Sequence, residues 1–378
     1  MEFELSSDQQ DLASAAGDLL DGLASRERIR AFVGSGTADD PGDRVDGFDR
    51  LLWEAMAEQG WLAVERPEAA GGLGLGMVEV AVLCEQLGRY TAPVPFLSSM
   101  LAMAALQGVG VDGVRPSAAA DAEGWARRLS AGEAVGCLVW AAEPGTVVAR
   151  PDGDRWLLTG RPEPTLYAAE ADVAVVVTEE AVYLVTRPQG ERPPPEPAMD
   201  RTRSLAWVPL DDTPAQRIGG GVSATRTVDR TAVGTAAELL GTAAHTLAMS
   251  VEYAQVRRQF GHPIGSFQSI KHTLADALVD VEAMRSSVYY AAWCLASGDP
   301  ETSLAASMAK AWCSDASQRV MAAGMQVHGG IGFTWEHDIH LSLKRARYDA
   351  ASFGTAPWHR ERIAALLQQR LAEGITPI

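Results

Sequence analysis

The order of two kinds of hydrophobic periodicity along the chain constrains the fold more than any other feature. Apolar residues recur at i, i+3 and i+4 from about residue 5 to 110, and again from about residue 224 onward. Between about 120 and 220, short β-branched runs alternate with Pro, Gly and Asp. We therefore predict a mainly α fold with a central β domain. The predicted domains are an N-terminal helical domain (1–118), a β domain (119–222) and a C-terminal helical bundle (223–378).

Local signals predict several element boundaries. Ser266 is expected to N-cap the second bundle helix, and Asp299 with Pro300 to begin the third. The glycine-rich EAAGGLGLGM is expected to be a turn between helices and not a dinucleotide-binding loop, because no strand pattern precedes it. The predicted strands are AVGCLVW, TVVAR, RWLLTG, ADVAVVVTE, AVYLVTR and LAWVPL.

Charge and cysteine usage exclude several classes of function. A formal net charge of −17 disfavours nucleic acid and anionic membranes as partners, although a local basic patch can still hold one phosphate group. No run of eighteen apolar residues occurs and the first residues are acidic, so we expect a cytoplasmic protein. The four cysteines show no CxxC pair and no metal-ligand spacing, which predicts reduced, buried thiols and no metal site. They are Cys84, Cys137, Cys294 and Cys313.

Two motifs in the C-terminal part suit a diphosphate. The first is VRRQFGHPIGSFQSIKHTLADA (256–277), in which the planar guanidinium of Arg257 can bond two phosphate oxygens at once. Phe260 beside it offers an apolar ring. The second is QVHGGIGFTWEHDIH (326–340), whose adjacent glycines let backbone N–H groups approach a phosphate closely. Arg257 has an alternative role, since a basic residue after a helix can cap its C-terminus.

These motifs, together with FGT (353–355) and the helix–β–helix order, resemble the acyl-CoA dehydrogenase family over nearly the whole chain. The resemblance implies that family's fold, with a small β-barrel-like domain and a C-terminal four-helix bundle. It implies FAD as cofactor, which takes a β-hydride from an acyl-CoA thioester while a carboxylate takes the α-proton. It also implies a set of residues that contact the ADP half of a neighbouring subunit's FAD. That set is Arg257, Gln259, Phe260, Ile264, Gln268, Gln326, Gly329, Gly330 and Thr355.

The chain departs from the family's pattern at the catalytic base. Phe353 and Thr231 stand at the two positions where family members carry a glutamate, and Ala232 replaces a family arginine. We therefore predict no catalytic residue in this chain. Three carboxylates lie nearby in sequence and are expected to be solvated or to cap helices. They are Asp229, Glu238 and Asp349.

The β domain departs from the pattern as well. Where relatives have a tryptophan strand beside the flavin, this chain has RPEPTLY, and its two prolines, Pro162 and Pro164, each remove an amide donor. Trp140 and Trp156 are expected to belong to the core of the β domain. The sequence therefore keeps the residues for the far half of a neighbour's FAD and lacks those that hold a flavin ring.

This selective loss resembles the accessory subunit of a heteromeric acyl-CoA dehydrogenase, as in the paired enzymes that shorten sterol side chains. The hypothesis is an α2β2 assembly whose second dehydrogenase-like subunit supplies the glutamate and most of the acyl-CoA site, this chain alone being inactive. The family resemblance also implies an electron-transfer flavoprotein as acceptor. Two alternatives stay open: a self-sufficient homotetrameric dehydrogenase or flavin monooxygenase with a displaced base, and a purely structural paralogue.

Overall fold

The computed structural model describes residues 4–34, 47–108, 114–186 and 192–375. The chain forms two compact units. The first unit contains Met1–Arg30, Met77–Ala92 and Ala232–Ile378, and the second contains Ala31–Gly76 and Pro93–Thr231. Helical segments from both ends of the sequence thus fold together in the first unit, and the middle of the sequence forms the second.

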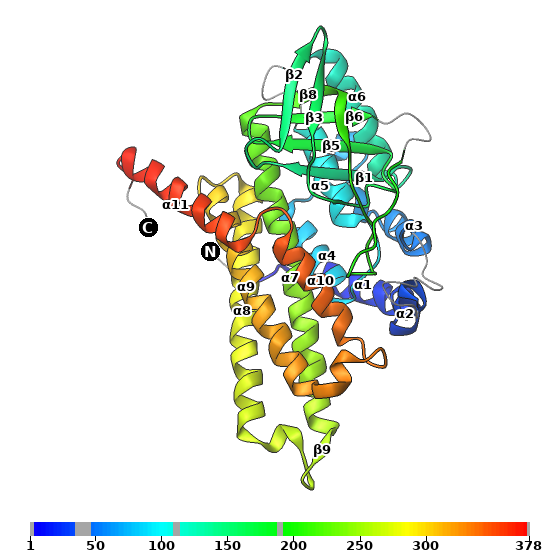
Figure 1. The fold of residues 1–378 in the computed structure, drawn as a ribbon, viewed down its shortest axis with the longest axis vertical. Coiled ribbons are helices and arrows are strands. Elements are labelled where there is room, and N and C mark those ends of the chain that lie inside the picture. Colours follow the sequence, from blue (N-terminus) through cyan, green and yellow to red (C-terminus); the bar gives the residue numbers. More distant parts are fainter. Residues whose placement is uncertain (1–3, 35–46, 109–113, 187–191, 376–378) are drawn as a thin grey trace. The chain divides into compact units, whose positions relative to one another are not determined.

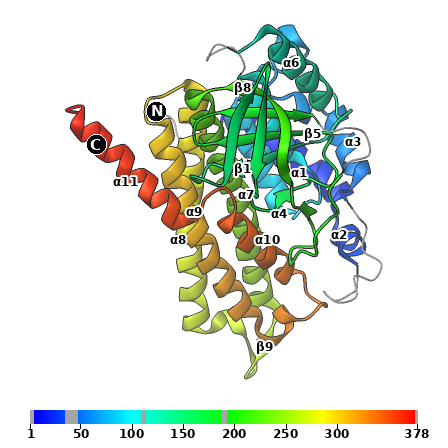
Figure 2. The same ribbon diagram turned by 45° about the horizontal axis from the view of Figure 1, so that its top comes forward.

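The first unit is helical. Helices α7, α8, α9 and α10 run side by side as an up-and-down bundle, and α11 leaves this bundle so that its C-terminal half extends away from it (Figures 1 and 2). Helix α7 begins in the second unit and continues through the first. The helices are α1 (Ser7–Leu23), the start of α2 (Arg26–Val33), α4 (Met77–Arg89), α7 (Gly221–Val256), α8 (Gln268–Ser297), α9 (Thr302–His328), α10 (Ile339–Ala351) and α11 (Ala356–Ala372).

Two glycines allow α4 and α7 to cross with their backbones in contact. A Cβ added to Gly241 would lie 1.8 Å from the Glu85 carbonyl oxygen, and one added to Gly88 would lie 2.2 Å from the Glu238 carbonyl oxygen. Any side chain at either position would push the helices apart. The sequence therefore encodes this crossing through residues that lack a side chain.

The second unit combines helical segments with a six-stranded sheet of order β1-β5-β6-β8-β3-β2. Strands β1 and β5 pair in parallel and the other neighbours are antiparallel. A separate two-stranded sheet joins β4 to β7. The helices are α3 (Arg50–Glu58), α5 (Phe96–Gln107) and α6 (Pro116–Ser130), with short 3-10 turns η1 (Trp61–Ala63) and η2 (Glu68–Ala70). The strands are β1 (Gly136–Ala141), β2 (Val147–Asp152), β3 (Arg155–Gly160), β4 (Thr165–Leu166), β5 (Val173–Thr178), β6 (Val182–Thr186), β7 (Leu205–Ala206) and β8 (Leu210–Gly219).

Most of the predicted elements are confirmed. Each predicted strand run overlaps an observed strand. The glycine-rich segment before α4 forms turns, and no described residue before it belongs to a strand. The segment with Pro162 and Pro164 lies between β3 and β4 and is not a strand. The four cysteines are buried and none of them forms a disulfide. Among the described residues, no helix is long and apolar enough to cross a membrane.

Two predicted helix starts differ from the structure by one residue, for α8, and by two residues, for α9. Helix α8 begins at Gln268, and Ser266 lies in a preceding 3-10 turn where its hydroxyl donates to the Pro263 carbonyl at 2.7 Å. Helix α9 begins at Thr302, and the Asp299 carboxylate accepts from the Glu301 backbone N–H at 2.8 Å. In both cases the side chain completes a turn just before the helix, which competes with capping of the helix itself.

Candidate functional site

Most residues of the predicted cofactor set lie at one end of the first unit's bundle. Antiparallel packing brings the end of α7, the start of α8 and the end of α9 to the same end. The rings of Tyr253 in α7 and His328 in α9 stack there at 4.5 Å between centroids. Arg257 directly follows α7, and Gln268 is the first residue of α8. Gln326 lies in the last turn of α9 and is exposed.

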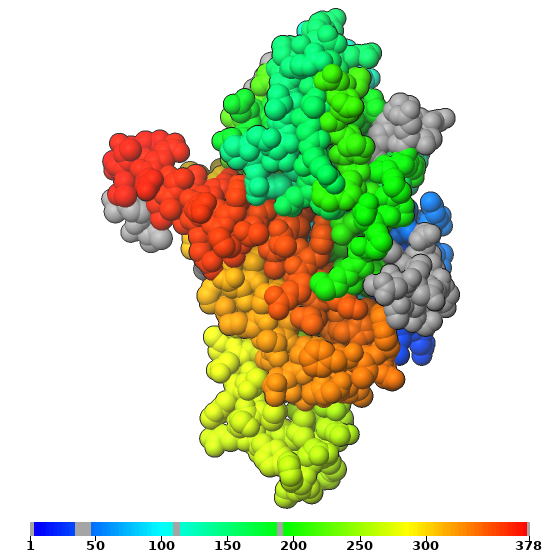
Figure 3. All heavy atoms as spheres, viewed as in Figure 1, coloured from blue at the N-terminus to red at the C-terminus, as the bar shows by residue number. Residues whose placement is uncertain are grey.

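A tight hairpin forms the tip of this end. Strand β9 (Arg258–Gln259) pairs with β10 (His262–Pro263), and a two-residue turn joins them. Both turn residues have positive φ, 52° at Phe260 and 84° at Gly261, as expected of a hairpin turn whose twist matches the strands. The Phe260 side chain is 89% exposed and meets Phe267 edge to face. Figure 3 shows this segment, in yellow-green, at the surface. The backbone thus holds an aromatic ring outward into solvent.

The polar groups at this end are open to a ligand. The exposed Arg257 side chain makes no ion pair or hydrogen bond within the described part of the chain, so it does not cap α7. A Cβ added to Gly329 or Gly330 would meet no atom within 4 Å, and Gly329 has φ 64°. Ile264 begins the 3-10 turn that follows the hairpin, and Gln259 uses its amide to donate to the Arg258 carbonyl.

This arrangement fits the ADP half of a dinucleotide. A diphosphate would meet an unpaired guanidinium and bare glycine backbone, and an adenosine would meet an exposed aromatic ring and two amide side chains. All of these groups face outward, so a ligand would approach them from outside this chain. Their assignment to FAD stays a prediction.

Thr355 does not lie with the others. The Lys310 ammonium donates to the Gly354 carbonyl at 3.1 Å, which places the segment 353–355 beside Lys310 in α9. Lys310 and His328 are 18 residues apart in α9, which corresponds to about 27 Å along the helix. Thr355 instead N-caps α11, where its hydroxyl accepts from the Trp358 backbone N–H at 3.4 Å.

Neither predicted base position offers a proton acceptor of the required kind. Phe353 is 7% exposed and has φ 54°, and the fully buried Thr231 hydroxyl donates to the Val228 carbonyl at 2.7 Å. Three nearby carboxylates were expected to be solvated or to cap helices. They are buried, so the solvated role is wrong. Each is 5% exposed or less and has interaction partners in the structure, which offset the cost of burying a charge. They are Asp229, Glu238 and Asp349.

The surroundings of Phe353 are closely packed and contain a buried lysine. Lys310 donates to the Ser314 hydroxyl and to the carbonyls of Ala350 and Gly354, all at 3.1–3.2 Å. Burial lowers the pKa of Lys310 to about 8, against the opposing effect of the Asp349 charge. The His359 ring contacts the Phe353 carbonyl at 3.1 Å, and burial lowers its pKa to about 3. The sequence signal for this cluster, one lysine within the apolar run SLAASMAKAW, was missed.

Comparison with known proteins shows which protein family the chain resembles. Residues 219–368 match the acyl-CoA dehydrogenase C-terminal domain, and residues 22–116 match the acyl-CoA dehydrogenase N-terminal domain. The chain is 36% identical to "Acyl-CoA dehydrogenase IpdE2" of Mycobacterium tuberculosis over 305 residues, which cover 80% of this chain and 82% of that relative. This class consists of flavin-dependent oxidoreductases that use FAD. The chain belongs to the acyl-CoA dehydrogenase family.

Two solved structures superpose on nearly the whole chain. The ChsE4-ChsE5 complex from Mycobacterium tuberculosis has a TM-score of 0.86 and 28% identity, with 100% of both chains covered. A variant of the Tcur3481-Tcur3483 steroid ACAD has a TM-score of 0.85 and 27% identity, covering 97% of this chain and 99% of that one. Each of these two structures is named for a pair of proteins.

Proposed function

We propose that this chain is the accessory subunit of a heteromeric acyl-CoA dehydrogenase, in which it contacts the ADP half of a partner's FAD. One contrast carries the proposal. Both base positions lack a carboxylate, at Thr231 and Phe353, whereas the guanidinium of Arg257 stands exposed and unpaired within the described part of the chain. A subunit of this kind retains binding capacity for a cofactor and leaves proton abstraction to its partner.

Each residue at the bundle end has a defined part in this proposal. Arg257 bonds two diphosphate oxygens, and Phe260 packs its ring against the adenosine. The amides of Gln268 and Gln326 offer donors and acceptors to the ribose and adenine. The backbone at Gly329 and Gly330 lies open to close approach by phosphate. The FAD itself, when bound, supplies the acceptor for the hydride.

The partner in this proposal is a second acyl-CoA dehydrogenase-like chain in an α2β2 assembly. It supplies the glutamate that takes the α-proton, and it binds most of the acyl-CoA. The names of the two superposed structures support such a partner, because each joins two proteins, and one is called a steroid ACAD. A steroid side-chain CoA ester is therefore the proposed substrate class. An electron-transfer flavoprotein as acceptor rests on the family resemblance alone.

The test compares two adjacent arginines in the assembled enzyme. The chain is co-expressed with a candidate partner, an acyl-CoA dehydrogenase-like chain that carries a glutamate at the base position, and flavin per complex is read from the visible spectrum. Arg257→Gln should weaken FAD binding roughly ten- to hundredfold, because a charge-assisted contact contributes about 1.5–3 kcal/mol. Arg258→Gln, in the same hairpin, is the matched control and should retain full flavin.

The remaining alternatives give different results. If the purified chain alone holds stoichiometric flavin and oxidises an acyl-CoA, the self-sufficient enzyme is correct and the accessory role is wrong. If Arg257→Gln leaves flavin content and affinity unchanged in the complex, the purely structural paralogue is favoured.

A further inference from the structure

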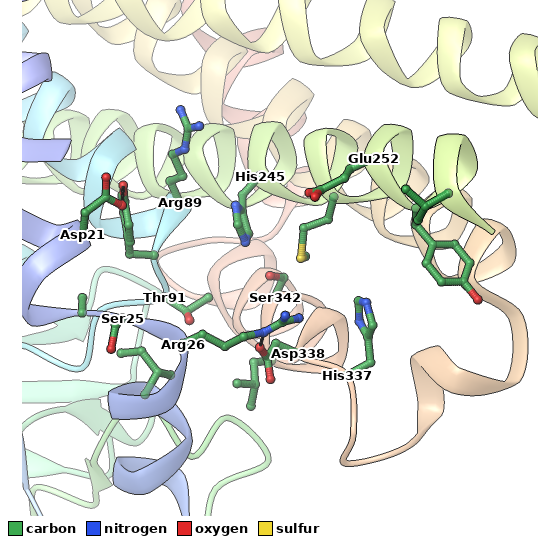
Figure 4. Close-up of a pocket in the computed structure, with 17 residues that line it drawn as sticks. Asp21, Ser25, Arg26, Arg89, Thr91, His245, Glu252, His337, Asp338 and Ser342 are labelled. Carbon is green, nitrogen blue, oxygen red and sulfur yellow. Dashed lines mark hydrogen bonds and ion pairs between the residues drawn. The ribbon is translucent and has the colours of Figure 1, made fainter. Parts of the chain in front are cut away.

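A cavity of about 560 Å³ lies within the first unit, and neither predicted base position is among its lining residues (Figure 4). Its walls come from α1, the start of α2, the end of α4, the second half of α7 and the start of α10. This volume is in the range of pockets that hold small organic ligands. The apolar part of its wall includes Ala24, Ile29, Met249, Tyr253 and Leu341.

Thr91, which lines the cavity, has an unusual backbone conformation. Its φ of 48° is rare for a β-branched residue, and residues held in such conformations gather at functional sites. Arg345 holds this backbone in place, because its buried guanidinium donates to the carbonyls of Thr91 and Ala92 at 3.1–3.2 Å. Thr91 is only 6% exposed, yet its hydroxyl lines the cavity and has no hydrogen-bond partner in the described ranges. A ligand in the cavity would therefore find this hydroxyl able to donate or accept a hydrogen bond.

A second buried hydroxyl and a neutral imidazole face the same space. Ser342 in α10 is 2% exposed and lines the cavity, and no described residue accepts or donates a hydrogen bond at its hydroxyl. His245 in α7 has no hydrogen-bond partner among the described residues. Burial and the charges of Arg89 and Arg26 lower the pKa of His245 to about 4, so the ring offers one donor and one acceptor near neutral pH. Figure 4 shows these side chains pointing into one space from separate elements.

Arg26 keeps hydrogen-bond donors that are open to a ligand. Arg26 and Arg30 both pair with the single carboxylate of Asp338, each through its Nε atom. The terminal nitrogens of Arg26 make no hydrogen bond to a described residue. Arg89, Asp21 and Glu252 also line the cavity, so together with Arg26, Arg30 and Asp338 the positive and negative side chains are equal in number. The open N–H groups of Arg26 suit one carboxylate.

We infer that this cavity is a binding site for a small organic monocarboxylate with an apolar body. The carboxylate would bond the terminal nitrogens of Arg26, and the hydroxyls of Thr91 and Ser342 with the His245 ring would complete its hydrogen bonds. The body would lie against Ile29, Met249 and Leu341. The inference does not rest on the proposed function, because none of these residues belongs to the predicted FAD contacts.

Octanoate tests this site in the full-length chain. Calorimetric titration with sodium octanoate should show saturable binding at one site, and octanamide, which has the same shape and no charge, should bind at least tenfold more weakly. Ser342→Ala should weaken octanoate binding roughly three- to tenfold, since one neutral hydrogen bond is lost. Ser286→Ala, on the exposed face of α8, is the matched control and should bind as the wild type does.

Three results would overturn the inference. They are equal affinity for octanoate and octanamide, unchanged affinity in Ser342→Ala, and inorganic phosphate binding more tightly than octanoate. Arg26→Gln gives a second check that avoids the core, because this side chain is largely exposed, and it should abolish the preference for octanoate over octanamide. The titrations need no flavin and no partner, so their failure leaves the proposed function untouched, and failure of the Arg257 test leaves this site untouched.

Discussion

The side chains around the two ends of α9 differ in their exposure to solvent. At its C-terminal end, Arg257 and Phe260 project into solvent and the neighbouring glycines are bare. Toward its N-terminal end, Lys310 is fully buried and hydrogen-bonded to three oxygens, and the nearby Phe353 is buried as well. Polar and aromatic groups are thus exposed at one end and closely packed at the other. Phe353, where the family resemblance implies a glutamate, is part of the core, while the side chains at the opposite end of the helix stay exposed.

The largest expected difference is in the effect of a Gly→Ala substitution on the free energy of unfolding at the two ends. A Cβ at Gly354 would lie 2.7 Å from the Trp358 ring at a φ of 90°, whereas a Cβ at Gly330 would meet no atom within 4 Å. Gly354→Ala should therefore lower the free energy of unfolding by roughly 3–5 kcal/mol, from strain and overpacking together. Gly330→Ala should change it by less than about 0.5 kcal/mol. Denaturant unfolding of both variants measures this, and equal effects would contradict the distinction between the ends.

The second-largest expected effect is a loss of folding stability at low pH, caused by the buried His359 at the packed end. The pKa of His359 is lowered by burial to about 3 in the folded chain, and that of an unfolded histidine is about 6.5. The unfolded state therefore binds the proton first, so this stability is complete above pH 6.5 and is lost as pH falls toward 3. His359 should account for about 3 kcal/mol of the loss between pH 6.5 and 4. Unfolding of the wild type and of His359→Asn across this range gives the difference, and parallel curves would refute it.

The smallest effect should appear at the open end. Phe260 is exposed, so Phe260→Ala should leave the free energy of unfolding unchanged within about 0.5 kcal/mol. In the complex it should weaken FAD binding by about 1 kcal/mol, the typical contribution of an aromatic contact. Leu371→Ala, at an exposed apolar residue of α11, is the control. Loss of thermal stability in Phe260→Ala with normal flavin content would show that the ring serves the fold.

Local periodicity predicted the order of most elements. It failed for elements whose structure depends on contacts between segments that are distant in sequence. RWLLTG coincides with β3, because its pattern is local. Strand β8 (Leu210–Gly219) was missed apart from its first residue, although it lies between β6 and β3 in the sheet. Its sequence LDDTPAQRIG is polar and contains Pro214, which argues against a strand in the absence of its neighbours. Helix α6 was also missed, since small residues dominate PSAAADAEGW.

The amino-acid sequence by itself determined the order of helical and β segments, the break between two bundle helices around Arg257 and the absence of a carboxylate at Thr231 and Phe353. Those features follow from local periodicity and from residue identity. Only the tertiary structure decided that Thr355 stands far from that turn along α9, and that Thr91 and Ser342 turn unpartnered hydroxyls, within the described part of the chain, into one cavity. Such features depend on the packing of segments that are distant in sequence, and no local pattern records that packing.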